Sequence, residues 1–257
     1  MTEQTTTTKP IEIEEDKHWW FAGRTWSLLN MIDRLVKPGS DKRVLDIGCG
    51  AGNMFHHLAH YGSVVGVDNN AKPLVVAHER GYDVREGVAE DLPFEDESQD
   101  LTALLDTVEH CDDDMAVLRE CYRVCAPGGH LVVTVPAFMW LWSNNDVLND
   151  HKRRYTAKEL REQLVRIGFR VNRMTYNNFF VFPMAAGLIL LRRRTEQEPD
   201  LASPHFDDES YQVEMEPAPP LLNTILSAVT WTESQVLRWV SLPVGTSIIA
   251  IAQKPAE

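Results

Sequence analysis

Three glycines and two acidic residues in the first part of the sequence have types and spacing that suit ligand binding. They are Gly48, Gly50 and Gly52, with Asp46 before them and Asp68 after them. Glycine accepts positive φ and carries no Cβ, so a ligand can lie directly against the backbone of such a turn. An acid at the end of the following strand can accept hydrogen bonds from both ribose hydroxyls of a nucleoside. The combination predicts a site for a nucleoside-containing cofactor.

The residues around the glycines predict the elements that position them. Val44, Leu45 and Ile47 form a short apolar run, which is typical of a central parallel strand. A helix is expected over 54–59, and the free N–H groups of its first turn would face the same ligand. A second strand is expected over 63–67, directly before the acid that follows it.

The pattern D-x-G-x-G-x-G over residues 46–52 differs from the dinucleotide fingerprint G-x-G-x-x-G, because its last glycine comes one residue earlier. With Asp68 after it, the pattern resembles the first two motifs of the class I S-adenosylmethionine-dependent methyltransferases. The resemblance implies S-adenosyl-L-methionine as the cofactor. It also implies an α/β fold with a doubly wound, mostly parallel, seven-stranded, Rossmann-like sheet. The last strand would then run antiparallel between the fifth and the sixth, after a helical insertion.

The family resemblance assigns further positions to the cofactor. An A-E-D-L-P-F segment contacts adenine in that family, so Ala89 and Glu90 are expected at the base edge; the alternative is a capped loop closed by Pro93. Asn69-Asn70 departs from the family, which often has an apolar residue there to stack on adenine. The other positions assigned to the cofactor are Arg24, for its carboxylate, and Asn53, Asn69, Asp106 and Thr107.

The N-terminal segment H-W-W-F-x-x-R, residues 18–24, resembles a subset of bacterial methyltransferases. A helix is expected over 24–36. The aromatic run before it either packs this helix onto the sheet edge or covers the cofactor or substrate. Trp20 is therefore a candidate substrate-binding residue.

Two histidines are the candidates for catalysis. The family carries an E-H pair like Glu109-His110, at the carboxyl end of the strand over 101–105; His110 would touch the cofactor's amino-acid part or serve as a base. His151 lies in the loop after the strand over 130–136, and imidazole with a pKa near neutrality suits removal of a hydroxyl proton. The alternative for His151 is a brace for its loop. Metal binding by Glu109, His110 and Asp112 is an alternative, but an acidic turn is the simpler explanation of these residues, so no metal is expected.

The candidate substrate residues follow the fifth strand. Trp140 belongs to an aromatic patch, and Arg153, Arg154 and Tyr155 follow it; the arginines either bind an anionic group or form a solvated face. The expected reaction is in-line methyl transfer, for which a protein mainly supplies alignment. The acceptor is expected to be a small molecule or one linked to a lipid or glycan, and to be methylated on oxygen rather than carbon. If the arginines bind it, the acceptor carries an anionic group.

The chain is divided by its composition. Residues 1–17 are expected to be a disordered tail, 18–176 and 244–257 a methyltransferase domain, and 177–243 a helical insertion with an acidic, proline-rich linker. The apolar run over 179–191 leads into three arginines. Residues 179–194 could lie at an anionic lipid surface, cover the active site or bury in a homodimer, but the run is too short to span a bilayer.

Charge and cysteine content exclude other classes. The net charge of −13 repels phosphate backbones, so a nucleic-acid partner is not expected. The four cysteines form no C-x-x-C pair, and no signal peptide is visible, so a cytoplasmic location is predicted, including the inner face of the membrane. Two alternatives stay open: a nicotinamide-dependent oxidoreductase, which the glycine spacing disfavours, and a non-catalytic module that holds the cofactor and docks a partner or membrane.

Overall fold

The computed structural model describes residues 13–39, 41–192 and 218–256. Most of the predicted N-terminal tail and of the predicted linker after residue 195 lies outside the described residues, as do Arg193 and Arg194.

A single seven-stranded sheet organises the described residues, with the strand order β3-β2-β1-β4-β5-β7-β6. β7 is antiparallel to both β5 and β6, and the other neighbours are parallel. The predicted fold class and the place of the last strand are therefore confirmed. The strands are β1 (Arg43–Ile47), β2 (Ser63–Asp68), β3 (Asp83–Glu86), β4 (Gln99–Leu105), β5 (Cys125–Pro136), β6 (Arg170–Asn177) and β7 (Ser247–Gln253).

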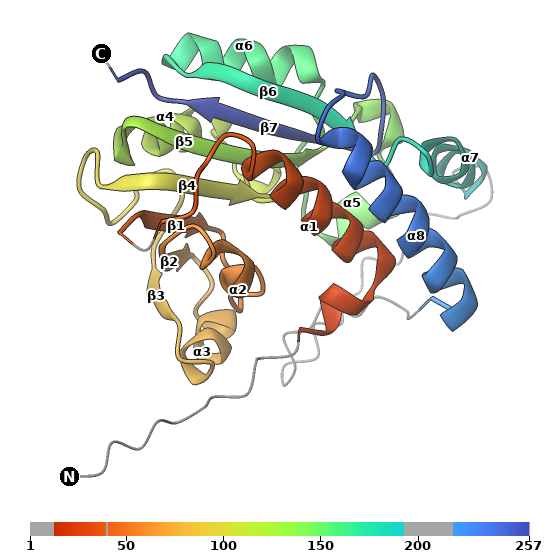
Figure 1. Cartoon of the computed structure of the whole chain (residues 1–257), viewed down its shortest axis with the longest axis horizontal. Helices are drawn as coiled ribbons and strands as arrows, with labels where there is room; N and C mark the ends of the chain where they lie inside the picture. The colour runs from red at the N-terminus through yellow and green to blue at the C-terminus, as the bar shows by residue number, and fades with distance from the viewer. Residues whose placement is uncertain (1–12, 40, 193–217, 257) are drawn as a thin grey trace.

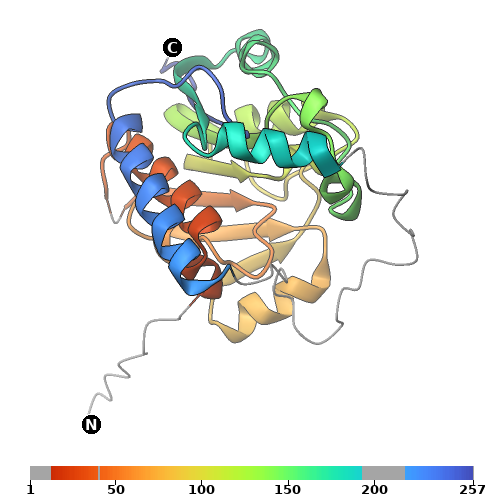
Figure 2. The same cartoon turned by 90° about the vertical axis from the view of Figure 1, so that its right-hand side faces the viewer.

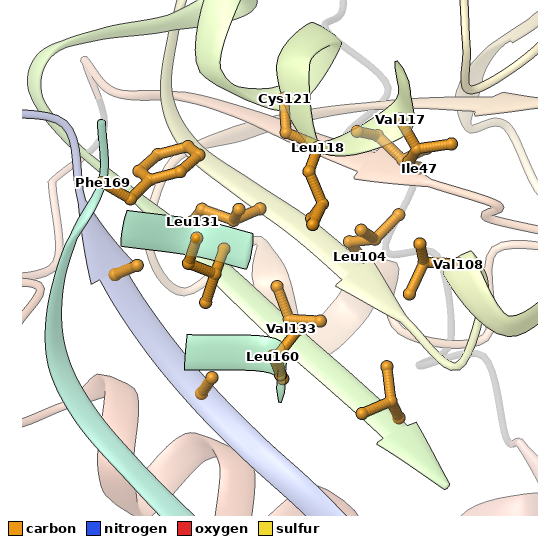
Figure 3. Packing of buried hydrophobic residues seen from close by; sticks show 14 of the residues in the cluster. Ile47, Leu104, Val108, Val117, Leu118, Cys121, Leu131, Val133, Leu160 and Phe169 are labelled. Carbon is orange, nitrogen blue, oxygen red and sulfur yellow. The ribbon is translucent and has the colours of Figure 1, made fainter. Parts of the chain in front are cut away.

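Helices cover both faces of the sheet, and the alternation of side chains along the strands explains this. Val44 of β1 packs with α1 (Trp19–Ile32) on one face, whereas Leu45 packs with α4 (Asp114–Val124) on the other. On the second face, buried side chains of α4 and α6 (Ala157–Ile167) meet β4 and β5 (Figure 3). The apolar run of β1 is thus buried on both sides, as a central parallel strand requires.

Helix α8 (Pro220–Leu237) runs beside α1 over the first face (Figures 1 and 2). The two helices approach closely because α1 has a glycine at the contact. A Cβ on Gly23 would lie 2.5 Å from the Cβ of Thr230. Two segments that are far apart in the sequence are therefore joined here.

The start of α1 differs from the sequence-based prediction. The helix begins at Trp19, not at Arg24, and the His18 side chain caps it by accepting the backbone N–H of Trp20 at 3.3 Å. The aromatic residues thus form the first turn of the helix. Helix α6 begins with a capping box, in which the Thr156 and Glu159 side chains each bond to the other's backbone N–H.

The remaining helices are short, apart from α7. Among the described residues no helix has the length and apolar character needed to cross a membrane. The remaining helices are η1 (Glu14–Lys17), α2 (Phe55–Leu58), α3 (Ala71–Glu79), η2 (Val108–His110), η3 (Met139–Leu141), α5 (Asn144–Leu148) and α7 (Phe182–Arg192).

Candidate functional site

The glycine turn between β1 and α2 contains three glycines with positive φ: +72° at Gly48, +52° at Gly50 and +76° at Gly52. A Cβ on Gly48 would lie 2.4 Å from Oγ1 of Thr107, and one on Gly52 would lie 2.5 Å from the Tyr82 ring. A Cβ on Gly50 would meet no atom of the described residues within 4 Å. Two of the glycines therefore permit close packing, and Gly50 borders open space that a ligand can fill.

Asp68 ends β2 beside this turn. One oxygen of its carboxylate accepts the backbone N–H of Gly50 at 2.8 Å, and the other accepts the N–H of Asn70 at 2.8 Å. A carboxylate has about four lone-pair sites, so both oxygens can still accept hydroxyl donors. Asn69 is exposed next to it. This geometry suits the two ribose hydroxyls for which the sequence pattern predicts the acid.

Asp46 lies beneath the turn and is only 3% exposed. Burial raises its pKa to about 7, and the nearby charge of Asp68 adds to the rise while Arg24 opposes it. A carboxyl group with such a pKa is half protonated near neutral pH. Asp46 can therefore offer either a donor or a charge to the turn.

Arg24 of α1 pairs with Asp106, the residue that follows β4. Asp106 has φ of +49°, and its backbone N–H and carboxylate both bond to Thr134 of β5, the carboxylate at 3.0 Å. Thr107 donates its hydroxyl to the Ile47 carbonyl at 3.0 Å. The guanidinium therefore reaches the carboxyl end of the sheet, where the resemblance places the cofactor's amino-acid part.

Asn53, predicted to contact the cofactor, is held by neighbours at both ends of its amide. Its Nδ2 donates to Glu15 at 2.7 Å, and its Oδ1 accepts from Arg80 at 2.6 Å. The side chain therefore ties η1 and the end of α3 to the glycine turn. Ala89 and Glu90 are half-buried after β3, and their contact with adenine stays a prediction.

His151 forms the centre of a buried polar cluster. Its Nδ1 lies 2.9 Å from Oδ1 of Asp146, which is fully buried in α5. Arg154 donates to both oxygens of this carboxylate, at 2.7 and 2.9 Å. Burial alone would raise the pKa of Asp146, but the hydrogen bonds from His151, Arg154 and Ser143 hold it well below its usual range. A permanent anion thus orients the His151 ring.

His110 lies edge-on to His151, with the ring centroids 4.8 Å apart. Burial, and then the neighbouring His151, lowers the pKa of His110. The loop of His151 is joined to η2 because the Lys152 N–H donates to the Glu109 carbonyl at 2.7 Å. The two predicted catalytic histidines are therefore brought together.

Glu109 is fully buried, and neither carboxylate oxygen has a hydrogen-bond partner among the described residues. Burial, and then the charge of Asp106, raises its pKa well above the ordinary value. Ligand atoms of Glu109, His110 and His151 all lie within 4.8 Å of one another, so this group could hold a divalent cation. From the sequence, Glu109 is expected only as part of the E-H pair and as an alternative metal ligand, and Asp146 has no expected role. The signal for Asp146 in the sequence is an acid shortly before a loop histidine.

Three of the predicted substrate residues make internal contacts, although the Arg153 side chain stays 37% exposed. Arg154 forms an ion pair with the buried Asp146. Arg153 and the Tyr155 hydroxyl donate to Asp114, at 2.8 and 3.3 Å. Tyr155 is only 1% exposed. Trp140, by contrast, is 45% exposed in η3 and lies edge-on to Phe182 of α7.

Trp20 occupies the first turn of α1. It is half-buried, and its ring meets that of Trp19 edge-on at 5.3 Å.

Comparison with known proteins identifies the kind of domain that this geometry belongs to. A family model described as a methyltransferase domain matches residues 45–133, which run from β1 into β5. This chain contains a class I S-adenosylmethionine-dependent methyltransferase domain. The methyltransferase domain thus includes the glycine turn, Asp68 and the Glu109-His110 pair.

Curated proteins that share more than a third of their residues with part of this chain are also methyltransferases. Ubiquinone biosynthesis O-methyltransferases from Pseudomonas entomophila and Pseudomonas putida (strain W619) are 38% and 37% identical over 114 residues. The match covers 40% of this chain and 47% of each relative, so the chain spans about half the length of these relatives.

Solved structures share the fold over most of the chain. A methyltransferase from Thermotoga maritima is 20% identical with a TM-score of 0.55, covering 92% of this chain and 93% of that one. Phosphoethanolamine N-methyltransferase 2 of Haemonchus contortus, solved with S-adenosyl-L-methionine, is 22% identical with a TM-score of 0.55, covering 88% and 52%. The [4+2]-cyclase SpnF is 20% identical with a TM-score of 0.57, covering 93% and 82%. At these identities the likeness shows the fold alone.

Proposed function

We propose that this chain transfers the methyl group of S-adenosylmethionine to an oxygen of a small or lipid-linked acceptor. The observation that carries the proposal is the His151–Asp146 pair, since an oriented imidazole in a loop that is bonded to η2, after β4, is a means of removing a hydroxyl proton. The name of the Pseudomonas relatives, ubiquinone biosynthesis O-methyltransferase, supports transfer to oxygen.

The residues of the glycine-turn site fit the cofactor. The open space at Gly50 can take an adenosine against bare backbone, and Asp68 has free lone pairs for the ribose hydroxyls. Arg24 can reach a carboxylate at the end of β4, where it now pairs with Asp106. S-adenosylmethionine supplies an activated methyl group on a sulfonium.

His151 is proposed as the general base. Asp146 accepts the Nδ1–H of the ring, which leaves Nε2 unprotonated and free to accept the acceptor's hydroxyl proton. Arg154 keeps the carboxylate charged and fixed, so its role is to position His151 and not to bind the acceptor. His110 packs edge-on against the His151 ring and so helps to hold its orientation.

We propose that an aromatic cluster next to Arg154 forms the rim of the acceptor site, which would suit an aromatic or prenyl-like acceptor. Phe138 stacks on Trp140 at 5.7 Å, and both rings meet Phe182 at the start of α7. Beyond Phe182, α7 exposes Met184, Leu188 and Leu191 at helical spacing. We propose that this face of α7 rests on the lipid surface that holds the acceptor.

A methyl-transfer assay tests the proposal. The full chain is supplied with radiolabelled S-adenosylmethionine and matched aromatic acceptors that carry a hydroxyl, an amine or neither. We expect labelling of the hydroxyl compound, with kcat lowered by about 100-fold or more in His151→Ala. Labelling of the amine alone would contradict O-methylation.

Binding measurements complete the test against the two alternatives. Binding of S-adenosylhomocysteine without turnover of any acceptor would favour the non-catalytic module. Binding of a nicotinamide dinucleotide in its place would favour the oxidoreductase.

A further inference from the structure

A second group of ligand-type side chains lies outside the methyl-transfer site, where η1 crosses α2. Nε2 of His56 is 2.9 Å from one oxygen of Asp16, and Nε2 of His57 is 3.0 Å from the other. The two imidazole rings lie 3.8 Å apart. Ligand atoms of all three residues lie within 4.8 Å of one another, although Asp16 is far from the histidines in sequence. The fold therefore gathers two imidazoles and a carboxylate at one point.

We propose that Asp16, His56 and His57 bind a divalent transition-metal ion of the zinc type. Two histidines and one carboxylate are a common set of ligands for zinc, with water as the fourth. Tetrahedral ligands at zinc distances lie about 3.3 Å apart, so the present N–O separations of 2.9 and 3.0 Å need only a small expansion. To bind the metal through Nε2, each neutral imidazole must carry its proton on Nδ1. The proton that Nε2 now directs at Asp16 therefore moves to Nδ1 through solvent.

The surroundings suit such an ion. All three side chains are between a fifth and two-fifths exposed, so a metal can enter from solvent without being fully hydrated once bound. The neighbouring cation Arg80 is committed to the Asn53 amide and the Ala51 carbonyl.

The position of the metal site gives it a consequence for the cofactor, and this step rests on the proposed function. Asp16 is followed by α1, which carries Arg24, and Glu15 holds Asn53 next to the glycine turn. A metal bound by Asp16 of η1 and by both histidines of α2 would hold η1 against α2, and with it the start of α1. Because coupling between two sites is reciprocal, metal and cofactor would each raise the other's affinity.

Cobalt titration of the full chain tests the metal site itself. Co²⁺ bound by two imidazoles and a carboxylate gives visible absorption, and Zn²⁺ competes for it. We expect one high-affinity ion in the wild type, with affinity lowered by more than tenfold in His57→Ala and in Asp16→Asn, since even an outer-shell partner costs 10- to 100-fold. His60→Ala is the matched control, being an exposed histidine just after α2, and should leave the titration unchanged.

Two outcomes of that titration would overturn the site: unchanged Co²⁺ affinity in the His56→Ala/His57→Ala double variant, or loss of the ion only in His110→Ala, which would move it to the Glu109 cluster. Far-ultraviolet circular dichroism of each variant confirms that the fold is retained.

Calorimetry with S-adenosylhomocysteine, with and without Zn²⁺, tests the coupling. We expect an affinity gain of about fivefold or more in the wild type and none in His57→Ala. Equal affinities would overturn the coupling. Absence of any S-adenosylhomocysteine binding would instead refute the proposed function, while the Co²⁺ result would still stand or fall by itself.

Discussion

The carboxylate of Asp68 accepts the backbone N–H of Gly50 at 2.8 Å, so the acid at the end of β2 fixes the one glycine of the turn that borders open space. The same carboxylate is proposed to accept two ribose hydroxyls. We therefore expect Asp68→Ala to weaken S-adenosylhomocysteine binding by about 100-fold or more, because each hydrogen bond to a charged group contributes about 1.5–3 kcal/mol. Isothermal calorimetry measures this. Asp83→Ala, an exposed acid at the start of β3, should bind normally; equal losses in both variants would argue against the role of Asp68.

A methyl group on Gly50 separates cofactor binding from backbone strain. Gly50→Ala places a Cβ in the open space, and its φ of +52° adds a strain of about 1 kcal/mol. Gly128 of β5 is a matched control, since it has φ of +78° and a Cβ added to it would likewise meet no described atom within 4 Å. We expect both alanine variants to lose similar stability in urea, and only Gly50→Ala to lose S-adenosylhomocysteine binding.

Asp46 should make the chain less stable at alkaline pH. Its pKa is about 7 in the folded state and near 3.8 when exposed, so folding binds a proton between these values. The stability from the protonated form is complete below about pH 3.8 and is lost as pH rises through 7. Asp46→Asn removes this dependence, and its stability relative to wild type should rise by a few kcal/mol between pH 5 and pH 8.5. Urea unfolding at both pH values measures it, and a pH-independent difference would contradict the assignment.

The partners of His151 should separate structure from catalysis. Asp146→Asn leaves the buried Arg154 guanidinium without its counter-charge, so we expect a loss of about 3–5 kcal/mol of unfolding free energy. His151→Ala should cost far less stability, yet abolish most turnover. Asp150→Asn is the control, because Asp150 is mostly exposed and should change neither quantity. Denaturation curves and methyl-transfer rates on the same samples test this, and a stable Asp146→Asn protein would contradict it.

The apolar face of α7 should govern contact with lipid. Leu188 and Leu191 are 50% and 60% exposed, and immersing both in a bilayer interface would contribute several kcal/mol at most. We expect Leu188→Glu/Leu191→Glu to reduce flotation with vesicles that contain anionic lipid by about tenfold or more. Leu221→Glu is the control, since Leu221 of α8 is 74% exposed on another helix. Unchanged flotation in the double variant would remove α7 from the membrane contact.

Local sequence patterns were sufficient for the elements that build the sheet. The apolar run before Asp46 predicts a central strand, and the Thr156–Glu159 spacing predicts a helix start, because both depend on neighbours within one turn or strand. The family resemblance added the place of β7, which no local pattern contains.

Contacts between distant segments could not be predicted. Arg154 has the sequence signature of a substrate-binding or solvated arginine, and only the placement of α5 shows that a buried Asp146 takes its charge. The predicted start of α1 at Arg24 was wrong because the helix already includes Gly23. A glycine is needed at this position because Thr230 of α8 approaches closely. Likewise, nothing in the sequence shows that Asp16 meets two histidines of α2.

The place of β7 between β5 and β6 has a consequence for how the chain acquires its shape as it is synthesised. Within the described part of the chain, β6 has no hydrogen-bonded strand neighbour other than β7, and β7 is synthesised only after α7 and α8. Until β7 is made, the other five strands can assemble, whereas β6 has no strand to pair with and its edges stay unpaired. We therefore expect the half of the molecule that binds cofactor to form first, and the half that bears the acceptor rim to close last.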